Sequence, residues 1–267
     1  MVPGSATEGV SDKSTPVVVF NDVRKTFGQQ QVLRGLSFEL QRGEISFIIG
    51  RSGEGKSVTI KHIIGVLHPD SGEIYVNGHK LTHAPETAWI QARRNMGLLF
   101  QDGALFDSMS VGENVAFPIC EFERLTPKEL TIRVESLLDL VGLPGYGNAK
   151  VPDLSIGQRK RVGLARALAL NPSILLYDEP TTGMDPLISE LIDTLIREMQ
   201  HKIPGLSSVV ISHDIQSVLR LADRIFFLHE GKMYATGRPV DFTTSKDPII
   251  RQFISGSLHG PLGKPIA

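Results

Sequence analysis

The stretch at residues 50–57, GRSGEGKS, constrains the fold of this chain more than any other feature of the sequence. It matches the pattern G-x-x-x-x-G-K-[ST], in which a glycine-rich turn wraps a phosphate and runs directly into a helix. Residues 45–49 before it are apolar and largely β-branched, as in a buried strand, and residues 57–67 carry apolar side chains at helical spacing. The bare pattern arises by chance in roughly one chain in a hundred of this length. In this context it predicts a nucleotide site.

The residue types in this stretch suit the chemistry of phosphate groups. Glycines allow close approach of the backbone, and the start of a helix offers N–H groups and a positive dipole end. The ammonium of Lys56 is expected to reach the β- and γ-phosphates, and the hydroxyl of Ser57 to hold Mg²⁺. The predicted nucleotide-binding residues are Gly50, Arg51, Ser52, Gly53, Glu54, Gly55, Lys56, Ser57 and Val58.

Length and composition limit the possible classes of protein. The 267 residues suit one large domain or two modest ones, and the net charge of −1 gives no reason to expect a nucleic-acid partner. The single cysteine, Cys120, excludes an intramolecular disulfide framework. No apolar run approaches the roughly 20 residues that span a bilayer, so a membrane role would require a partner. Residues 1–16 are predicted to be a disordered leader.

The rest of the chain indicates an α/β core with an inserted helical part. Strands are predicted at 17–20 and 32–40 around a polar turn, and another apolar run at 96–100 ends on Gln101. A helical subdomain is expected over about 102–170, because amphipathic patterns occur at 111–117 and 127–141. Phe27 precedes the first turn; it is either a base-stacking or a core aromatic, and spacing alone favours the core.

A helix start follows at residues 154–158, LSIGQ. Ser155 and Gln158 have the spacing of a capping box, directly before a helical pattern at 159–170. An exposed helix start can bind an anion, but it can equally be a plain cap. Without the phosphate-binding stretch, we would favour the plain cap.

Two further apolar runs end in polar side chains. Residues 174–177 lead into Asp178 and Glu179, and residues 208–211 lead into Ser212 and His213. Parallel strands place such residues at the carboxyl edge of the sheet, where ligands bind. Asp178 is expected to support Mg²⁺, Glu179 to orient or deprotonate water, and His213 to sense the γ-phosphate. The alternatives, solvated acids and a structural histidine, are less favoured beside a phosphate site.

With these pieces in this order, residues 17–237 resemble the nucleotide-binding subunit of ABC transporters. The resemblance implies a P-loop NTPase (ABC ATPase) core with an antiparallel β subdomain and an inserted helical subdomain. Phe27 lies where the family has its adenine-stacking aromatic, so the resemblance favours base stacking over the core role. The matching motifs are Walker A (residues 50–57), the Q-loop (Gln101), the signature (Leu154, Ser155, Gly157, Gln158), Walker B with its glutamate (Asp178, Glu179), the D-loop (Asp185) and the switch histidine (His213).

The resemblance also implies how these residues work together. Two copies of the chain would enclose two ATP molecules, each held by Walker A of one copy and the signature of the other. Glu179, His213 and Gln101 would be catalytic, and Ser57, Gln101 and Asp178 would hold Mg²⁺. One position departs from the family pattern LSGGQ: Ile156 replaces a glycine, and its β-branched side chain restricts the backbone.

A narrower resemblance, to the ATPases of MCE-type (Mla-type) lipid transporters, is carried by residues 100–109, 113–118 and 247–256, with Gly260 and Pro261 after them. It implies a phospholipid cargo, a membrane permease, an MCE-type lipid-binding subunit and a place on the cytoplasmic face of the inner membrane. The alternatives are a small-solute importer or, from another class, a soluble ABC ATPase acting on ribosomes or DNA. The single cassette and the short interval between Gln101 and Leu154 disfavour the soluble class.

The C-terminal tail, residues 238–267, carries an apolar stripe. Ile249, Ile250, Phe253 and Ile254 have helical spacing after a possible helix start at 247–248. This stripe must be covered, either by its own domain or, as the narrower resemblance favours, by another subunit.

Overall fold

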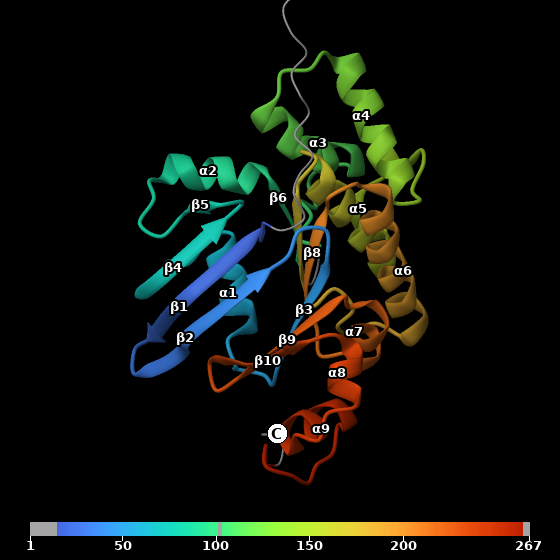
Figure 1. Cartoon of the computed structure of the whole chain (residues 1–267). Coiled ribbons are helices and arrows are strands. Elements are labelled where there is room, and N and C mark those ends of the chain that lie inside the picture. The colour runs from blue at the N-terminus through green and yellow to red at the C-terminus, as the bar shows by residue number, and fades with distance from the viewer. Residues whose placement is uncertain (1–14, 101–102, 264–267) are drawn as a thin grey trace, which may run out of the picture.

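The chain is built around a six-stranded sheet with the strand order β10-β9-β3-β8-β7-β6 (Figure 1). The computed structural model describes residues 15–100 and 103–263. Five of the six strands run parallel, and β10 pairs antiparallel with β9 at one edge. The strands are β3 (Ile45–Ile49), β6 (Met96–Leu99), β7 (Ile174–Asp178), β8 (Ser207–Ile211), β9 (Arg224–His229) and β10 (Lys232–Gly237).

Side chains from the central strands alternate between two hydrophobic cores. In β7, Leu175 and Tyr177 enter one core, whereas Ile174 and Leu176 enter the other. A parallel strand that is buried on both faces needs apolar residues at every position, which explains its continuous apolar sequence. The parallel pairings bring the carboxyl ends of β3, β6, β7 and β8 to one edge of the sheet.

A second, antiparallel sheet in the order β2-β1-β4-β5 lies beside the first and confirms the predicted β subdomain (Figure 1). Its first strand continues to Phe27 through irregular pairings, well beyond the predicted end at residue 20. The elements of this part are β1 (Val18–Phe27), β2 (Gln30–Leu40), α1 (Lys56–Ile63), β4 (Ser71–Val76), β5 (His79–Lys80) and α2 (Glu86–Arg94).

Helices α3 (Val111–Phe122), α4 (Pro127–Leu140) and α5 (Ile156–Leu168) follow, with short 3₁₀ turns at Tyr146–Asn148 and Val151–Asp153. Helix α3 continues through Pro118, although a proline inside a helix removes a hydrogen bond. Buried side chains on both sides of it, Val115 and Ile119, hold the helix against the core and outweigh that loss. Each of the three helices starts with a complete capping box.

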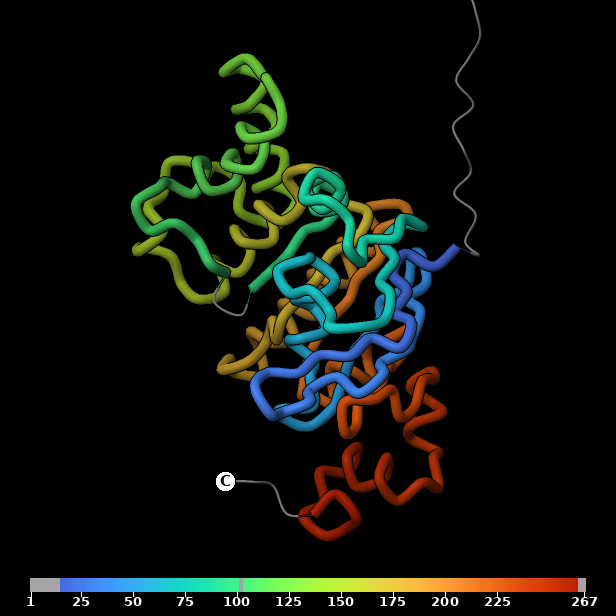
Figure 2. The backbone as a smooth tube through the Cα atoms, turned by 90° about the vertical axis from the view of Figure 1, so that its left-hand side faces the viewer, coloured from blue at the N-terminus to red at the C-terminus, as the bar shows by residue number. Residues whose placement is uncertain are grey.

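The last two helices lie at the opposite end of the molecule from α3 and α4 (Figures 1 and 2). After α6 (Pro186–Lys202) and α7 (Ile215–Leu221), the tail forms α8 (Pro239–Thr243) and α9 (Pro248–Ser255). The apolar stripe of α9 packs on its own domain: Ile250 is buried, and the ring of Phe253 lies 4.7 Å from that of Phe227. The chain thus covers the stripe itself, and contact of the tail with another subunit stays a prediction. Within the described ranges, no helix is long and apolar enough to cross a membrane.

Candidate nucleotide-binding site

Residues 50–57, the phosphate loop, form a closed turn between β3 and α1. Lys56 is 5% exposed, and its ammonium donates hydrogen bonds to the carbonyls of Gly50 (2.8 Å) and Arg51 (2.9 Å). Gly50 and Gly55 have φ values of 153° and 102°. A Cβ at Gly50 would lie 2.6 Å from the carbonyl oxygen of Leu228, so glycine is required there. The loop therefore takes the shape that the sequence predicted.

A cavity of about 340 Å³ lies beside this loop, and we call it the nucleotide cavity. Phe27 forms part of its wall and is 44% exposed, so the core role that spacing alone favoured is wrong. Sequence reasoning missed Gln30 and Val32, which follow the β1–β2 turn and carry no motif. The described lining residues are Phe27, Gln30, Val32, Ser52, Gly53, Gly55, Lys56, Ser57, Val58 and Glu179.

Two side chains whose oxygen atoms could hold a cation, those of Ser57 and Asp178, lie together where β7 ends beside α1. The hydroxyl of Ser57 donates to a carboxylate oxygen of Asp178 at 3.5 Å. Burial, and then the charge of Glu179, raise the pKa of Asp178. Hard oxygen ligands and crowded negative charge suit Mg²⁺. Within the described ranges, no cluster of three or more His, Cys, Asp or Glu side chains could hold a metal ion.

Glu179 adopts an unusual backbone conformation with a φ of 50°. This left-handed conformation costs a non-glycine residue roughly 1–2 kcal/mol. The hydrogen bond from its N–H to the carbonyl of Ile211 (3.0 Å) holds it in place. Its carboxylate oxygen Oε2 lies 2.9 Å from Nε2 of His213 and accepts a hydrogen bond from the Thr182 hydroxyl at 3.2 Å. Glu179 and His213, which the sequence predicted to lie together, are therefore in contact. Thr182 is a further neighbour of Glu179 that sequence reasoning missed.

The buried ammonium of Lys56 is influenced by the negative charges of three carboxylates. Burial lowers the pKa of Lys56, and the charges of Glu179, Glu54 and Asp178 oppose that change. Glu54 itself points to β9, where Oε1 lies 3.3 Å from Nδ1 of His229. Burial is the largest effect, so the pKa of Lys56 lies below its ordinary value despite these three carboxylates.

The signature residues lie at the start of α5 and form the predicted capping box. The hydroxyl of Ser155 accepts from the N–H of Gln158 (3.3 Å), and the side chain of Gln158 accepts from the N–H of Ser155 (2.9 Å). Ile156 is the first helical residue and is 67% exposed, so the backbone there does not need glycine. Among the described residues, the wall of the nucleotide cavity includes none of Leu154, Ser155, Gly157 and Gln158.

Three other residues complete the account. Asp185 caps α6, and its carboxylate accepts from the N–H groups of Leu187 (3.0 Å) and Ile188 (3.1 Å). Lys160, buried in α5, donates to the carbonyl of Pro180 at 2.6 Å and so ties the signature helix to the segment after Glu179. The sequence around Lys160 gave no sign of this hydrogen bond.

The predicted residue Gln101 lies outside the described residues.

Comparison with known proteins agrees with this geometry. The family model described as ABC transporter matches residues 33–182. The chain belongs to the ABC transporter family. It is 40% identical over 269 residues to the protein TRIGALACTOSYLDIACYLGLYCEROL 3 of Arabidopsis thaliana, covering 95% of this chain and 78% of that protein. It is 36% identical over 246 residues to the intermembrane phospholipid transport system ATP-binding protein MlaF of Escherichia coli, covering 92% and 91%.

The ABC ATPase fold is confirmed by solved structures. The dimeric ATP-binding cassette MJ0796, solved after hydrolysis with ADP and Pi bound, matches with a TM-score of 0.75 at 30% identity and covers 83% of this chain and 98% of that one. As a member of the ABC transporter family, the chain binds and hydrolyses ATP.

Proposed function

We propose that this ABC ATPase drives the transport of phospholipid across the cell envelope through a separate membrane permease. The observation that carries the proposal is the alignment with MlaF, which extends over nearly the whole of both chains. The proposal places the ATPase on the cytoplasmic face of the inner membrane, with an MCE-type lipid-binding subunit in the same complex.

The proposal gives each residue in and beside the nucleotide cavity a role in binding or hydrolysis. Phe27 stacks on the adenine, and Lys56 with the loop N–H groups binds the β- and γ-phosphates. The hydroxyl of Ser57 and the carboxylate of Asp178 would hold Mg²⁺, together with Gln101. A bound Mg²⁺ would neutralise charge on the phosphate oxygens.

Glu179 is the general base of the proposed hydrolysis. Its carboxylate accepts a proton from the water whose oxygen attacks the γ-phosphorus, while ADP leaves. His213 and Thr182 both contact the same oxygen of that carboxylate, Oε2, at 2.9 and 3.2 Å. Glu179 also lines the nucleotide cavity, where the attacking water would lie.

The proposed working unit contains two copies of the chain. In one copy, Ser155 and Gln158 use their capping atoms inside their own helix and stay outside the nucleotide cavity. In a head-to-tail pair, the exposed start of α5 would meet the γ-phosphate held by the partner's phosphate loop. Asp185, which caps α6, would lie at the same junction.

The permease is proposed to dock in an apolar groove of about 360 Å³ between β6, α3 and α5, which we call the aromatic groove. The rings of Phe106 and Phe117 lie 5.1 Å apart in it, and both are partly exposed. Partly exposed aromatic side chains in a groove are typical anchors for a partner helix. Phe100, which immediately precedes Gln101, also lines the groove, so the docked partner would touch the segment that leads to the nucleotide.

Arg166 connects the aromatic groove to α5. Its guanidinium donates to the carbonyls of Gly103 (2.8 Å) and Ala104 (2.9 Å) and lies 5.9 Å from the ring centre of Phe106. Movement of α5 on closure of the nucleotide sandwich would therefore reach the groove directly.

The test is affinity purification of the tagged chain from its native membrane, followed by mass spectrometry of retained proteins and lipids. We expect a permease and enrichment of phospholipid over the bulk membrane. Phe117→Asp should lose the permease but keep ATP binding, whereas Ile132→Asp, on exposed α4, should keep both. Recovery of a permease with a small-solute-binding protein and no lipid enrichment would contradict the lipid proposal.

A further inference from the structure

The end of the described chain, residues 257–263, folds back onto the phosphate loop, and we call it the C-terminal arm. The guanidinium of Arg51, in the phosphate loop, donates to the carbonyl of Leu262 in the arm at 2.6 Å. These residues are 211 positions apart in sequence. A segment with no catalytic motif thus touches the loop that binds phosphate.

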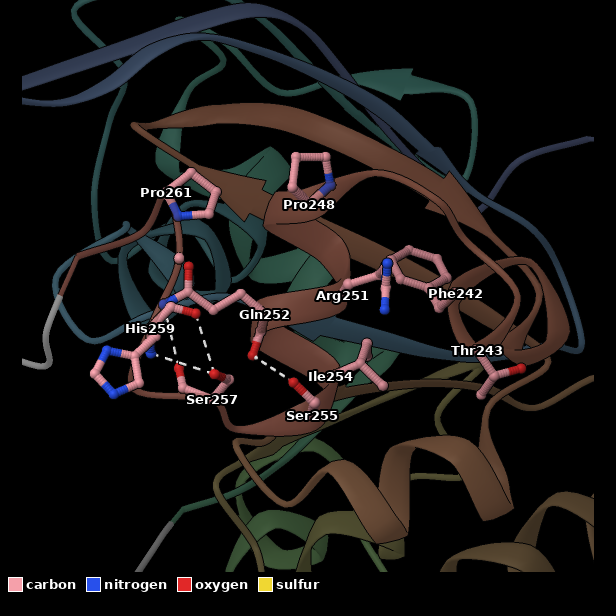
Figure 3. Close-up of a pocket in the computed structure, with 11 residues that line it drawn as sticks. Phe242, Thr243, Pro248, Arg251, Gln252, Ile254, Ser255, Ser257, His259 and Pro261 are labelled. Carbon is pink, nitrogen blue, oxygen red and sulfur yellow. Dashed lines mark hydrogen bonds between the residues drawn. The ribbon is translucent and has the colours of Figure 1, made fainter.

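One side chain, Gln252 of α9, holds the arm in place. It is 6% exposed, and its amide oxygen accepts from the N–H of Leu262 at 2.7 Å. Its amide nitrogen donates to the carbonyls of Ser257 (3.2 Å) and Gly263 (3.4 Å). Figure 3 shows this side chain extending from α9 towards the segment that carries Ser257 and His259. A buried amide with both ends engaged fixes the path of the backbone around it.

The arm fits closely around this amide. Gly260 has a φ of 153°, and a Cβ there would lie 2.4 Å from the side-chain oxygen of Gln252. Helix α9 is capped by Asp247 and is held against the sheet by the packing of Phe253 on Phe227 of β9. The arm is therefore fixed to the sheet through α9.

A cavity of about 660 Å³ separates the phosphate loop from α9, and Ser52, Gly53 and Phe253 are among its lining residues. Ser52 and Gly53 also line the nucleotide cavity, so this part of the loop lies between two open spaces. The contact between Arg51 and Leu262 therefore restrains a loop that lies between two cavities.

We propose that Gln252 is a positioning residue for ATP binding, acting through Leu262 and Arg51. The carbonyl of Arg51 accepts from Lys56, while its guanidinium holds the arm. A displaced arm would let Arg51 shift and loosen the turn that presents Lys56 to the phosphates. The inference rests on the nucleotide site of this ATPase and not on the transport proposal.

The test uses Gln252→Met in the full chain, which keeps the volume and removes the hydrogen bonds. Titration calorimetry with Mg·ATP should show an affinity about three- to tenfold weaker, with kcat within about twofold of wild type. Ser255→Ala removes a hydrogen bond within the same helix and serves as the matched control, with unchanged affinity. Gly260→Ala would press a Cβ against the Gln252 amide and displace the arm while keeping Gln252 itself. It should weaken affinity in the same direction, which decides the question if Gln252→Met fails to fold.

A double-mutant cycle separates positioning from general stability. In an Arg51→Met background, Gln252→Met should change ATP affinity by less than about twofold, because the connecting contact is already gone. Wild-type affinity in both Gln252→Met and Gly260→Ala, or an undiminished effect in the Arg51→Met background, would overturn the proposal. Absence of ATP binding by the wild-type chain would contradict the nucleotide site instead.

Discussion

The carboxyl edge of the six-stranded sheet and the start of α5 carry parts of the same machinery, but they are built in different ways. At the sheet edge, Lys56 and Glu179 line a cavity of their own chain. Lys56 is buried there, and two side chains of the same chain contact the carboxylate of Glu179. At the start of α5, Ser155 is exposed and the capping contacts close on the helix itself. The residues of the sheet edge contact one another within the chain, whereas the start of α5 is exposed to solvent.

Under the proposed function, this difference means that one chain would build only half of each nucleotide site. Changes at the sheet edge should damage binding or chemistry in a single copy. Changes at the start of α5 should matter only where two copies meet. The predictions below test this contrast.

The largest effect is expected for Glu179→Gln at the sheet edge. The amide keeps the shape and some hydrogen bonding but cannot accept the proton from water, so kcat should fall by about 10²- to 10⁴-fold. ATP affinity should change little, because the carboxylate is not a phosphate ligand. Phosphate release and calorimetry measure the two quantities, and turnover near wild type would remove Glu179 from the role of base.

Lys56→Ala should have the second-largest effect, a loss of ATP affinity. Each charge-assisted hydrogen bond contributes about 1.5–3 kcal/mol, so ATP affinity should weaken by roughly 10- to 100-fold or more. Lys202→Ala, which removes an exposed lysine paired with Glu198 on α6, is the control and should bind normally. Unchanged affinity in the Lys56 variant would exclude the phosphate loop as the binding element.

Ser155→Ala should lower turnover by about tenfold while leaving the ATP affinity of a single chain unchanged. Loss of the cap destabilises α5 by about 1 kcal/mol, and the γ-phosphate loses the hydroxyl supplied by the partner. Thr126→Ala removes the equivalent cap of α4 and controls for helix stability. If both variants lose turnover equally, the start of α5 is only a helix cap.

The smallest effect is expected for Ile156→Gly. If this exposed side chain hinders closure over the γ-phosphate, its removal should raise turnover, by less than about threefold. Glycine adds backbone freedom and weakens the first turn, which limits the gain. Equal or lower turnover would mean that Ile156 is accommodated in the closed pair.

The sequence allowed the sheet edge to be predicted almost completely. Parallel strands end at one edge, so apolar runs that stop at Asp178 and before Ser212 and His213 could be placed together with the phosphate loop. The capping box at Ser155 was equally predictable, because its spacing is local. Local pattern and strand polarity are sufficient for both.

Other features could not be predicted, for physical reasons. The positive φ of Glu179 is accompanied by a hydrogen bond from its N–H to the carbonyl of Ile211 on a neighbouring strand, and glutamate has no preference for that conformation. The contact between Arg51 and Leu262 depends on the burial of Gln252, a polar residue that pattern analysis assigns to the surface. The exposure of Phe27 follows from the extension of β1, which its sequence does not mark.

The most direct test of the central claim is the mass of the Glu179→Gln chain in solution, measured by light scattering during size exclusion. Without nucleotide we expect a monomer, and with saturating Mg·ATP a dimer, because each phosphate loop then meets the α5 start of the other copy. Adding Ser155→Ala to this variant should weaken the dimer. A chain that stays monomeric with saturating Mg·ATP would contradict the account of two half-sites.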